Sequence, residues 1–317
     1  MPEASVDLIL TDPPYFKVKD EPWDNQWAKP QQFLAWLDTV LAEFQRILKA
    51  NGSLYLFASP QMSARVEVLI AQRFHILNSI RWHKADGWHK KTRKEDLRSY
   101  LTPWEAVIFA EQFGCQYADA EKALHKEVFA PIGRYIQIER ERAGMSRNDL
   151  EVALGFVSSN DPARGTALCY RWEEGASLPA PETYERIRSV LNSNGGEFLR
   201  REYEDLRREY EDLRRPFAVT ADTPHTDLWT FNPVRPYAGK HPCEKPAAML
   251  EHIINASSRP GDVVFDAFAG TGSTGISAMK LGRRFIGAEM SERHHAEAIR
   301  RISESTIPEP QADLFAA

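Results

Sequence analysis

Two stretches of the sequence, one toward each end, alternate short apolar segments with longer segments of helical periodicity, and this alternation restricts the fold more than any other feature. The short segments have the length and composition of buried strands. They cover residues 6–10, 54–57, 76–82, 106–110, 263–266 and 285–289. Amphipathic helices are predicted over 33–48, where Asn51-Gly52 would end the helix, and over 273–281. Strands covered by such helices predict an α/β fold, with one sheet built from both stretches.

The segment between these two stretches has a different pattern, in which short helices are joined by short loops. The predicted helices cover residues 132–143, 147–154, 168–174 and 181–191. Ser146 is placed to cap the second of them. The sequence therefore predicts a discontinuous main domain that carries an all-α insert. The predicted boundaries are 1–128 and 216–304 for the main domain, 129–215 for the insert, and 305–317 for a flexible tail.

A seven-residue duplication lies near the end of the insert, because the sequence of residues 201–207 recurs at 208–214. The apolar positions there are spaced alternately by four and three residues, which is the spacing of a coiled-coil seam. They are Leu199, Tyr203, Leu206, Tyr210 and Leu213. Two interpretations stay open: the helix packs this stripe on the core of its own domain, or it pairs with the same helix of a second copy in a homodimer.

Composition excludes several other classes of protein. With 43% apolar and 27% charged residues over 317 positions, the chain can build a large core, so disorder and fibrous repeats are excluded. Its longest apolar runs fall short of the roughly 18 residues that a membrane span needs, and its first residues lack the pattern of a secretory signal. Cys115, Cys169 and Cys243 are widely spaced, which indicates neither a disulfide framework nor a zinc site. These features predict a cytoplasmic protein with no membrane and no metal partner.

The most specific motif is Asp12-Pro-Pro-Tyr15, which directly follows the first predicted strand. Two successive prolines fix a rigid turn, because each ring restricts φ and removes an N–H donor. The Asp12 carboxylate and the Pro13 carbonyl can then project together at the carboxyl edge of the sheet, and Tyr15 offers an aromatic face. The two acceptors match the two N–H donors of an exocyclic amino group. The structural alternative is an ordinary turn at the end of a strand.

A second turn, Phe268-Ala-Gly-Thr-Gly272, joins a predicted strand to a predicted helix. Glycines at such a turn let the backbone approach a ligand closely, and Glu289, at the end of the following strand, is placed to accept hydrogen bonds from a ribose. The turn has two glycines where the dinucleotide fingerprint has three, so a purely structural turn is the alternative for this motif alone. With the acidic strand end added, the pattern favours a nucleoside site.

Three motifs resemble those of the β-class amino DNA methyltransferases, in the same order along the chain: Asp12-Pro-Pro-Tyr15, His241-Pro-Cys-Glu-Lys-Pro246, and Asp266-Ala-Phe-Ala-Gly-Thr-Gly-Ser-Thr274. The resemblance covers most of the chain. It implies a circularly permuted, Rossmann-like class I methyltransferase sheet. It also implies transfer of a methyl group from S-adenosylmethionine to N6 of a flipped-out adenine in a short DNA site. Asp-Pro-Pro-Tyr is usual for adenine in this class, and N4 of cytosine is the near alternative.

By this resemblance, Asp12, Pro13, Pro14 and Tyr15 form the catalytic motif, with Tyr15 as the stacking partner of the extruded base. The implied cofactor site contains Lys245, Asp266, Phe268, Gly270, Gly272, Ser273, Thr274 and Glu289. Members of the class usually carry one further strand ahead of the catalytic motif, with an acidic residue that contacts the adenine of the cofactor. Met1 lies ten residues before Thr11, so we expect the sheet and the adenine pocket to be incomplete.

A basic segment at 81–98 holds seven Lys or Arg against three Asp or Glu, together with two tryptophans. A loop of this kind suits contacts to the phosphates of double-stranded DNA. The candidate residues are Lys84, Lys90, Lys91, Arg93, Lys94 and Arg98. The alternative is a solvated charged loop.

The insert resembles the helix-turn-helix of phage-repressor-type regulators at 138–154 and 167–175, although residues 158–165 lengthen the turn. If it docks on DNA in the usual way, a few side chains lie nearest the base edges, while Trp172 belongs to the core. The nearest residues are Arg164, Thr166, Tyr170 and Arg171. A structural or oligomerising role for the insert is the alternative.

The tail contains a short segment, Gln311-Ala-Asp-Leu-Phe315, that resembles the peptide with which bacterial proteins bind the replicative sliding clamp. Its expected clamp contacts are Gln311, Leu314 and Phe315. Together the resemblances favour a site-specific DNA adenine methyltransferase of a bacterium or phage, of the restriction-modification type. The alternatives are an N4-cytosine methyltransferase, a DNA-binding regulator with a degenerate methyltransferase fold, and a methyltransferase of RNA or small molecules. The intact catalytic motif disfavours the regulator.

Overall fold

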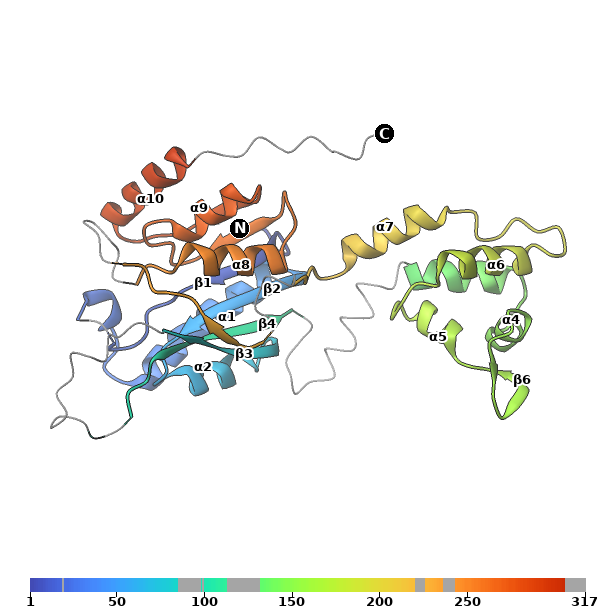
Figure 1. Cartoon of the computed structure of the whole chain (residues 1–317), viewed down its shortest axis with the longest axis horizontal. Helices are drawn as coiled ribbons and strands as arrows, with labels where there is room; N and C mark the ends of the chain where they lie inside the picture. The colour runs from blue at the N-terminus through green and yellow to red at the C-terminus, as the bar shows by residue number, and fades with distance from the viewer. Residues whose placement is uncertain are drawn as a thin grey trace. The chain divides into compact units, whose positions relative to one another are not determined.

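The computed structural model describes residues 1–18, 20–84, 98, 100–112, 132–219, 226–235 and 243–305. The chain divides into two compact units, Met1–Ala118 with Arg215–Ala317 and Asp119–Arg214. The first unit contains a sheet covered by helices, and the second is mainly helical (Figure 1). The α/β class predicted for the two ends of the sequence is confirmed.

The sheet of the first unit joins strands from both ends of the sequence. Its described strands are β1 (Val6–Thr11), β2 (Leu48–Ala58), β3 (His75–His83), β4 (Trp104–Glu111), β7 (Leu228–Thr230), β8 (Val263–Asp266) and β9 (Arg284–Gly287). Their order across the sheet is β7-β3-β4-β2-β1-β8-β9. β1 pairs in parallel with both β2 and β8, and β4 runs antiparallel between β2 and β3. The loops that follow β1 and β8 therefore leave the same edge of the sheet.

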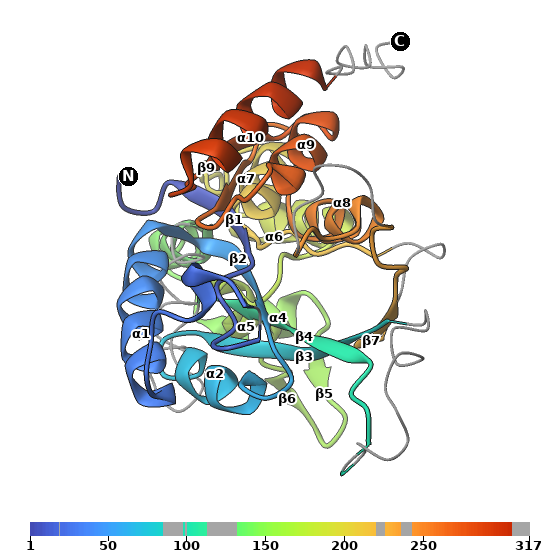
Figure 2. The ribbon, with the colours of Figure 1, turned by 90° about the vertical axis from the view of Figure 1, so that its left-hand side faces the viewer.

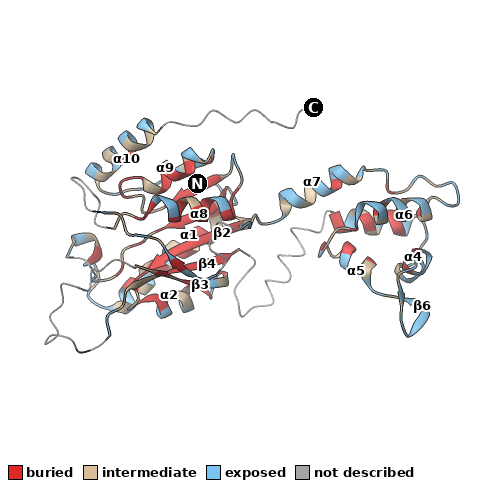
Figure 3. Ribbon diagram, in the orientation of Figure 1, coloured by how far each residue is buried: buried red, intermediate tan, exposed pale blue. Residues whose placement is uncertain are grey.

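Helices cover both faces of this sheet (Figure 2). One face carries α1 (Pro30–Ile47) and α2 (Ser63–Ile70), and the other carries α8 (Ala247–Ser257) and α9 (Ser273–Lys280). A further helix, α10 (Glu292–Glu304), packs against α9. Because successive side chains of a strand point to opposite faces, each central strand feeds two separate cores. In Figure 3 the central strands are buried along most of their length.

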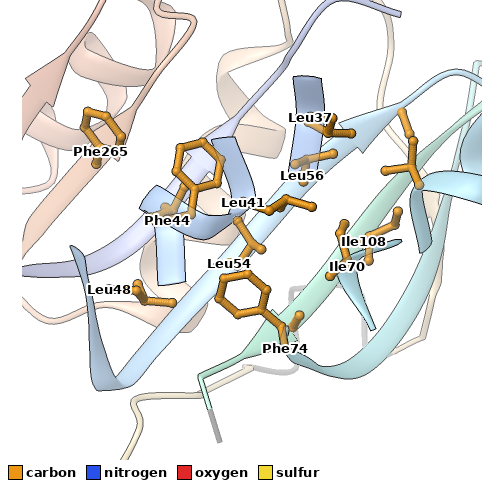
Figure 4. Packing of buried hydrophobic residues seen from close by; sticks show 14 of the residues in the cluster. Leu37, Leu41, Phe44, Leu48, Leu54, Leu56, Ile70, Phe74, Ile108 and Phe265 are labelled. Carbon is orange, nitrogen blue, oxygen red and sulfur yellow. The ribbon is translucent and has the colours of Figure 1, made fainter. Parts of the chain in front are cut away.

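The core under α1 shows how the sequence pattern becomes packing. Leu37, Leu41 and Phe44 recur at helical spacing and point from α1 onto β2, where Leu54 lies between them and Phe74 (Figure 4). All of these side chains are buried. Burial of a side chain of this size stabilises the fold by about 1.5–3 kcal/mol, so this face contributes a large part of the stability of the unit.

The end of α1 differs from the prediction. Asn51-Gly52 does not end the helix; α1 ends at Ile47, and β2 begins at Leu48 and runs through both residues. The pairing of β2 with β1 shifts register within this segment, and the irregular part contains the Asn-Gly pair. A Cβ at Gly52 would lie 2.6 Å from the side chain of Leu48, so the glycine permits the strand to fold closely over its own first residue.

The second unit contains more than helices. A helix over residues 132–142 is followed by α4 (Arg147–Ala153), α5 (Leu168–Glu173), α6 (Pro181–Leu191) and α7 (Tyr203–Leu213). Ser146 caps α4 as predicted, because its side chain accepts the N–H of Asp149. The prediction of an all-α insert is wrong, since β5 (Val157–Ser158) and β6 (Asp161–Gly165) form an antiparallel hairpin.

Polar side chains explain this hairpin. Asn148 of α4 accepts the N–H of Gly165 over 2.9 Å and donates to the Ala163 carbonyl over 3.1 Å, so it holds the returning strand by its backbone. Asp161 accepts the N–H of Ala163 over 3.0 Å. Residues 158–165, which lengthen the turn of the helix-turn-helix-like region, therefore belong to an ordered β-hairpin.

The duplicated segment packs on its own unit. Leu206 of α7 is fully buried, and Tyr203, Tyr210 and Leu213 pack against the same core. Leu199 is also buried, but it lies before the helix in a left-handed conformation with φ of 56°, so the helical seam begins at Tyr203. The structure thus supports the first of the two interpretations, a stripe laid on the core of its own domain.

Candidate active site

The loop after β1 carries the predicted catalytic motif, at the edge where β1 and β8 both end. Thr11, the last residue of β1, is buried, and its Oγ1 donates a hydrogen bond to Asp266 at the end of β8 over 2.8 Å. This bond ties the two strand ends together. Asp12 and the glycine turn that follows Asp266 therefore start from neighbouring, fixed positions.

A buried carboxylate that no sequence motif singles out shapes the catalytic loop. Asp24 is fully buried, and its two oxygens accept the N–H groups of Tyr15 over 2.5 Å and of Val18 over 2.7 Å. Between them Phe16 and Lys17 have φ angles of 63° and 59°, a strained conformation for residues with a Cβ. The Asp24 carboxylate holds this strained turn and so sets the direction of Tyr15.

Four charged side chains and one tyrosine form a cluster at the catalytic edge, which we call the charged row. Lys245 forms a close ion pair with Asp12, and its Nζ lies 3.8 Å from Oε2 of Glu105. Lys84 forms a close ion pair with Oε1 of Glu105, and the Tyr15 hydroxyl donates to Oε2 of Glu105 over 3.2 Å. Charges alternate along the row Lys84, Glu105, Lys245, Asp12, so its positive and negative charges balance.

The Lys245 ammonium is enclosed by aromatic rings as well as by carboxylates. Its Nζ lies 5.3 Å from the centroid of the Tyr15 ring and 4.8 Å from that of Phe57. Only 7% of the side chain is exposed. Aromatic faces attract a cation most strongly when it is desolvated, so these rings help to keep a charged lysine in this position.

Burial and neighbouring charges act in opposite directions on the charged row. Burial raises the pKa of Asp12; Lys245 opposes this effect, Glu105 adds to it, and the pKa stays above its usual value. Burial lowers the pKa of Lys245, but Asp12 and Glu105 outweigh it and raise that pKa. Burial raises the pKa of Glu105, but Lys245 and Lys84 outweigh it and lower that pKa. Neighbouring charges therefore favour the charged forms of Lys245 and Glu105, whereas burial opposes the charge of Asp12.

Asp12 keeps one acceptor atom for a ligand. Its Oδ2 is bonded to Lys245, whereas its Oδ1 is buried and receives no hydrogen bond from any residue that the structure describes. A buried acceptor without a donor costs about 1–3 kcal/mol. A ligand that brings an N–H group to this oxygen would recover that free energy.

The structure places the predicted site residues Tyr15 and Lys245 against each other. Tyr15, which is predicted to stack on the extruded base, is 8% exposed; its N–H is bonded to Asp24, and the Lys245 ammonium lies against its ring. Lys245, which is predicted to line the cofactor site, takes part in the charged row through its ammonium.

The glycine turn lies beside the catalytic loop and has the backbone freedom that the sequence predicts. Gly270 and Gly272 have φ angles of 52° and 82°, which residues with a side chain adopt only under strain. Glu289 follows β9, and its carboxylate accepts the N–H of Gly270 over 2.9 Å and that of Ser291 over 2.8 Å. The strand-end acid and the turn are thus fixed to each other, and Phe268 at the start of the turn is half-buried against Trp36.

Asp266 and Thr274, which are predicted to line the cofactor site, are bonded to each other at the start of the glycine turn. Asp266 is 4% exposed and accepts hydrogen bonds from Thr11 over 2.8 Å, from Thr274 over 2.7 Å and from the N–H of Phe268 over 3.1 Å. Both carboxylate oxygens are therefore engaged inside the protein. Asp266 joins the two strand ends to the first turn of α9.

Two residues for which the sequence predicts no role of their own hold the glycine turn. Glu244 has a side chain that is 6% exposed, and it accepts hydrogen bonds from Ser273 over 3.1 Å and from Arg301 of α10 over 2.8 Å. Arg301 also donates to Oγ1 of Thr271 over 2.7 Å. Since Glu244 precedes Lys245, one short segment links the glycine turn to the charged row.

The buried Asp266 predicts a pH-dependent stability. Burial raises its pKa to about 6 in the folded protein, against 3.8 for the free side chain. Between these values the unfolded chain ionises while the folded one stays protonated, so the free energy of unfolding falls as pH rises toward about 6, by about 3 kcal/mol in all. We expect Asp266→Asn to lack this component. Urea unfolding of both proteins from pH about 4 to about 7 checks it, and a constant difference in stability over that range contradicts it.

The predicted DNA-contact residues of the first unit are only partly within the described ranges. Lys84 is not at an open surface: it pairs with Glu105 and lies 4.7 Å from the centroid of the Trp82 ring, because β3 ends at the catalytic edge. Arg98 is exposed. Outside the described residues lie Lys90, Lys91, Arg93 and Lys94, and also the tail residues Gln311, Leu314 and Phe315.

The predicted DNA-contact residues of the insert are all exposed. Arg164, Thr166, Tyr170 and Arg171 lie in β6, before α5 and on α5, whereas Trp172 is buried. The carboxylate of Glu151 accepts the N–H groups of Ala167 and Cys169, each over 2.8 Å, and so fixes the start of α5. These four side chains therefore project from a rigid support.

Two features are absent from the part of the chain that the structure describes. No group of three or more His, Cys, Asp or Glu side chains there is arranged to hold a metal ion. In the same ranges, no helix is both long enough and apolar enough to cross a membrane.

One family of known proteins matches nearly the whole chain. The family of DNA methylases, which groups N6 and N4 methyltransferases, matches this chain over residues 6–300. The chain therefore belongs to the DNA methylase family.

Three individual proteins are similar to this chain over part or most of its length. The DNA adenine methyltransferase YhdJ of Escherichia coli (strain K12) is 26% identical over 304 residues, which cover 95% of this chain and 78% of the relative. The type II methyltransferase M2.DpnII of Streptococcus pneumoniae is 44% identical over 79 residues, 24% of this chain and 30% of the relative. Among solved structures, the cytosine-N4-specific PvuII DNA methyltransferase is similar in fold, with a TM-score of 0.52 and 15% identity over 95% of this chain and 80% of that one.

Proposed function

We propose that this DNA methylase transfers a methyl group from S-adenosylmethionine to N6 of adenine in a short DNA site. The observation that carries the proposal is the buried Oδ1 of Asp12, which has no donor among the described residues and lies at the edge where the glycine turn also starts. S-adenosylmethionine is the methyl donor of the family. A relative from E. coli is named a DNA adenine methyltransferase, which favours adenine over cytosine.

The glycine turn fits the cofactor by its chemistry. The turn approaches a ligand through backbone without side chains at Gly270 and Gly272, and Glu289 places a carboxylate where a ribose hydroxyl can donate to it. When bound, S-adenosylmethionine supplies a methyl group that is electrophilic because it is attached to a positively charged sulfur. Arg301 and Glu244 hold the turn in place through hydrogen bonds.

Asp12 and the Pro13 carbonyl then act on the target amine. An exocyclic amine is a poor nucleophile because its lone pair is delocalised into the ring. Two N–H donors bonded to Oδ1 of Asp12 and to the Pro13 carbonyl favour a pyramidal nitrogen whose lone pair points away from these acceptors. Lys245 supports this by keeping Asp12 ionised and by occupying Oδ2, so that Oδ1 is left for the amine. The base has to leave the duplex to reach this edge.

A methyl-transfer assay tests the proposal. The purified chain is incubated with isotope-labelled S-adenosylmethionine and double-stranded DNA, and the digested nucleosides are separated by mass spectrometry. We expect label in N6-methyladenine alone. Label in N4-methylcytosine would show that cytosine, and not adenine, is the target base. Binding of DNA without label in any nucleoside would favour a DNA-binding regulator.

The insert is the proposed DNA-recognition element, with the helix-turn-helix resemblance at α4 and α5 as its support. Each arginine that contacts bases or phosphates contributes about 1–3 kcal/mol, so we expect the double variant Arg164→Ala/Arg171→Ala to bind its DNA site about 10²-fold more weakly. Arg208→Ala, at a side chain of α7 that is 73% exposed, is the control and should bind within about threefold of the wild type. Fluorescence anisotropy measures both. Equal binding by the double variant and the control would assign the insert to the structural alternative.

Four further expectations rest on sequence or on the proposed activity. Formation of a homodimer and binding of the tail to the sliding clamp stay predictions from the duplicated segment and from Gln311, Leu314 and Phe315. A permuted strand order of the β class is proposed from the order of the motifs. Action on DNA implies that the protein works in the cytoplasm of a bacterium, either as a bacterial protein or as a protein of an infecting phage.

A further inference from the structure

Glu105 stands at the centre of the charged row, although no motif contains it. It is the second residue of β4, and its side chain is 16% exposed. Oε1 pairs with Lys84, whereas Oε2 accepts the Tyr15 hydroxyl over 3.2 Å and lies 3.8 Å from Nζ of Lys245. One carboxylate thus contacts two lysines and the tyrosine of the catalytic motif.

We propose that Glu105 is a positioning residue for methyl transfer, which holds Lys245 against Oδ2 of Asp12 and thereby leaves Oδ1 of Asp12 to the target amine. The inference rests on the proposed function and adds a residue to it. Glu105 does not touch the amine in this arrangement; it acts through Lys245 and Tyr15.

Geometry supports a positioning role over a purely structural one. Lys245 is in contact with two carboxylates and also lies over the faces of Tyr15 and Phe57. Without the charge of Glu105, its ammonium has Asp12 as its one remaining carboxylate partner among the described residues, so Nζ can move to bridge both oxygens of Asp12. A bridging lysine would compete with the amine for Oδ1.

The sheet supplies a matched control at the opposite end of the same strand. Glu111 is the last residue of β4, its side chain is 11% exposed, and it too contacts two nitrogen-bearing side chains, His75 over 3.0 Å and Arg215 over 2.8 Å. Glu105→Gln and Glu111→Gln therefore each remove one negative charge from the same strand. In both cases the carboxylate lies beside two nitrogen-bearing side chains. Only the first lies next to Asp12.

The first readout is kinetic. A displacement of about 1 Å at a reacting centre costs about 10²-fold in rate, so we expect Glu105→Gln to lower kcat about 10²-fold with KM values for S-adenosylmethionine and DNA within about threefold of the wild type. Glu111→Gln should keep kcat within about threefold. Equal kcat values for the two variants, or a loss in Glu105→Gln that appears wholly in KM, would overturn the positioning role.

The second readout does not depend on methyl transfer. Lys245 is buried and paired, so an amine-reactive reagent should label it slowly, as measured by mass spectrometry of its peptide. We expect labelling of Lys245 to become at least about tenfold faster in Glu105→Gln and to stay unchanged in Glu111→Gln. Unchanged labelling in Glu105→Gln would overturn the proposal. If Glu105→Gln speeds the labelling of Lys245 but the wild-type protein methylates no DNA, the arrangement of the charged row stands and the proposed function is rejected.

A second variant covers poor folding of Glu105→Gln. Glu105→Asp keeps the charge but withdraws the carboxylate by one methylene, so the contact with Lys245 lengthens while the row stays balanced. Its kcat and its Lys245 labelling should fall between those of the wild type and Glu105→Gln. Wild-type values in both measurements would contradict the requirement for close contact.

Discussion

Asp12→Asn is expected to lower the rate of methyl transfer about 10³-fold, the upper range for removal of one oriented group that acts in the transition state. Asparagine keeps the size of the side chain but presents one carbonyl oxygen and one NH2 group. The ion pair with Lys245 is lost, and an NH2 group directed at the target amine is a donor facing a donor. Binding of S-adenosylmethionine should change by less than about threefold, because the glycine turn is untouched.

Single-turnover kinetics with saturating cofactor and DNA measure this effect. The matched control is Asp7→Asn, at the opposite end of β1, where the carboxylate pairs with Lys49 and accepts the N–H of Val263. That variant loses a half-buried carboxylate from the same strand and should transfer methyl groups at nearly the wild-type rate. If Asp12→Asn and Asp7→Asn have similar rates, Asp12 does not accept a hydrogen bond from the target amine.

Lys245→Met is the variant with the second largest expected effect, and its effect depends on pH. Burial already raises the pKa of Asp12, and Lys245 is the cation that opposes this shift. Without it the pKa of Asp12 rises further, so Asp12 is protonated at pH values where the wild type has a carboxylate. A protonated Oδ1 cannot serve as the acceptor, so the acid limb of the rate profile should move to higher pH, with about a 10²-fold loss at neutral pH.

The same variant should also be less stable. Removal of one partner from a buried ion pair costs about 3–5 kcal/mol, because the other charge is left without compensation. Lys49→Met is the control, since Lys49 pairs with Asp7 at the far end of β1 and its side chain is 37% exposed. It should shift neither the acid limb nor kcat. An acid limb that stays in place in Lys245→Met would show that Lys245 does not control the ionisation of Asp12.

The parts of the site that could be predicted from sequence are those set by local chain geometry. A buried strand followed by Asp12-Pro-Pro-Tyr15, and another followed by a glycine turn, place two loops at the carboxyl edge of one sheet, and β1 and β8 are indeed neighbours. The acid after β9 is fixed to that turn as the spacing suggests. These relations depend on strand ends and on backbone conformation, which short segments specify.

The residues that escaped prediction depend on contacts between distant segments. Glu105 looks like any acid at the start of a strand until the sheet brings it to Tyr15 and Lys245. Asp24 and Arg301 lie in segments without a motif, and each acts on a loop reached only after folding. The bond between Asp266 and Thr11 escaped prediction for the same reason, because Thr11 lies on another strand.

The insert shows a limit of a different kind. Its helices follow from capping and periodicity, as at Ser146, but the hairpin of β5 and β6 is too short to show alternating apolar residues. Its strands are held by Asn148 through backbone groups, which leave no trace in hydropathy.

The central claim is that Asp12 directs methylation of adenine in DNA. It is tested most directly by modified-base sequencing of DNA from a methylation-free bacterium that expresses this chain, beside the same strain with Asp12→Asn. The account predicts N6-methyladenine in one short sequence context with the wild type and none with the variant. Unmodified DNA in both strains, or equal modification in both, would contradict it.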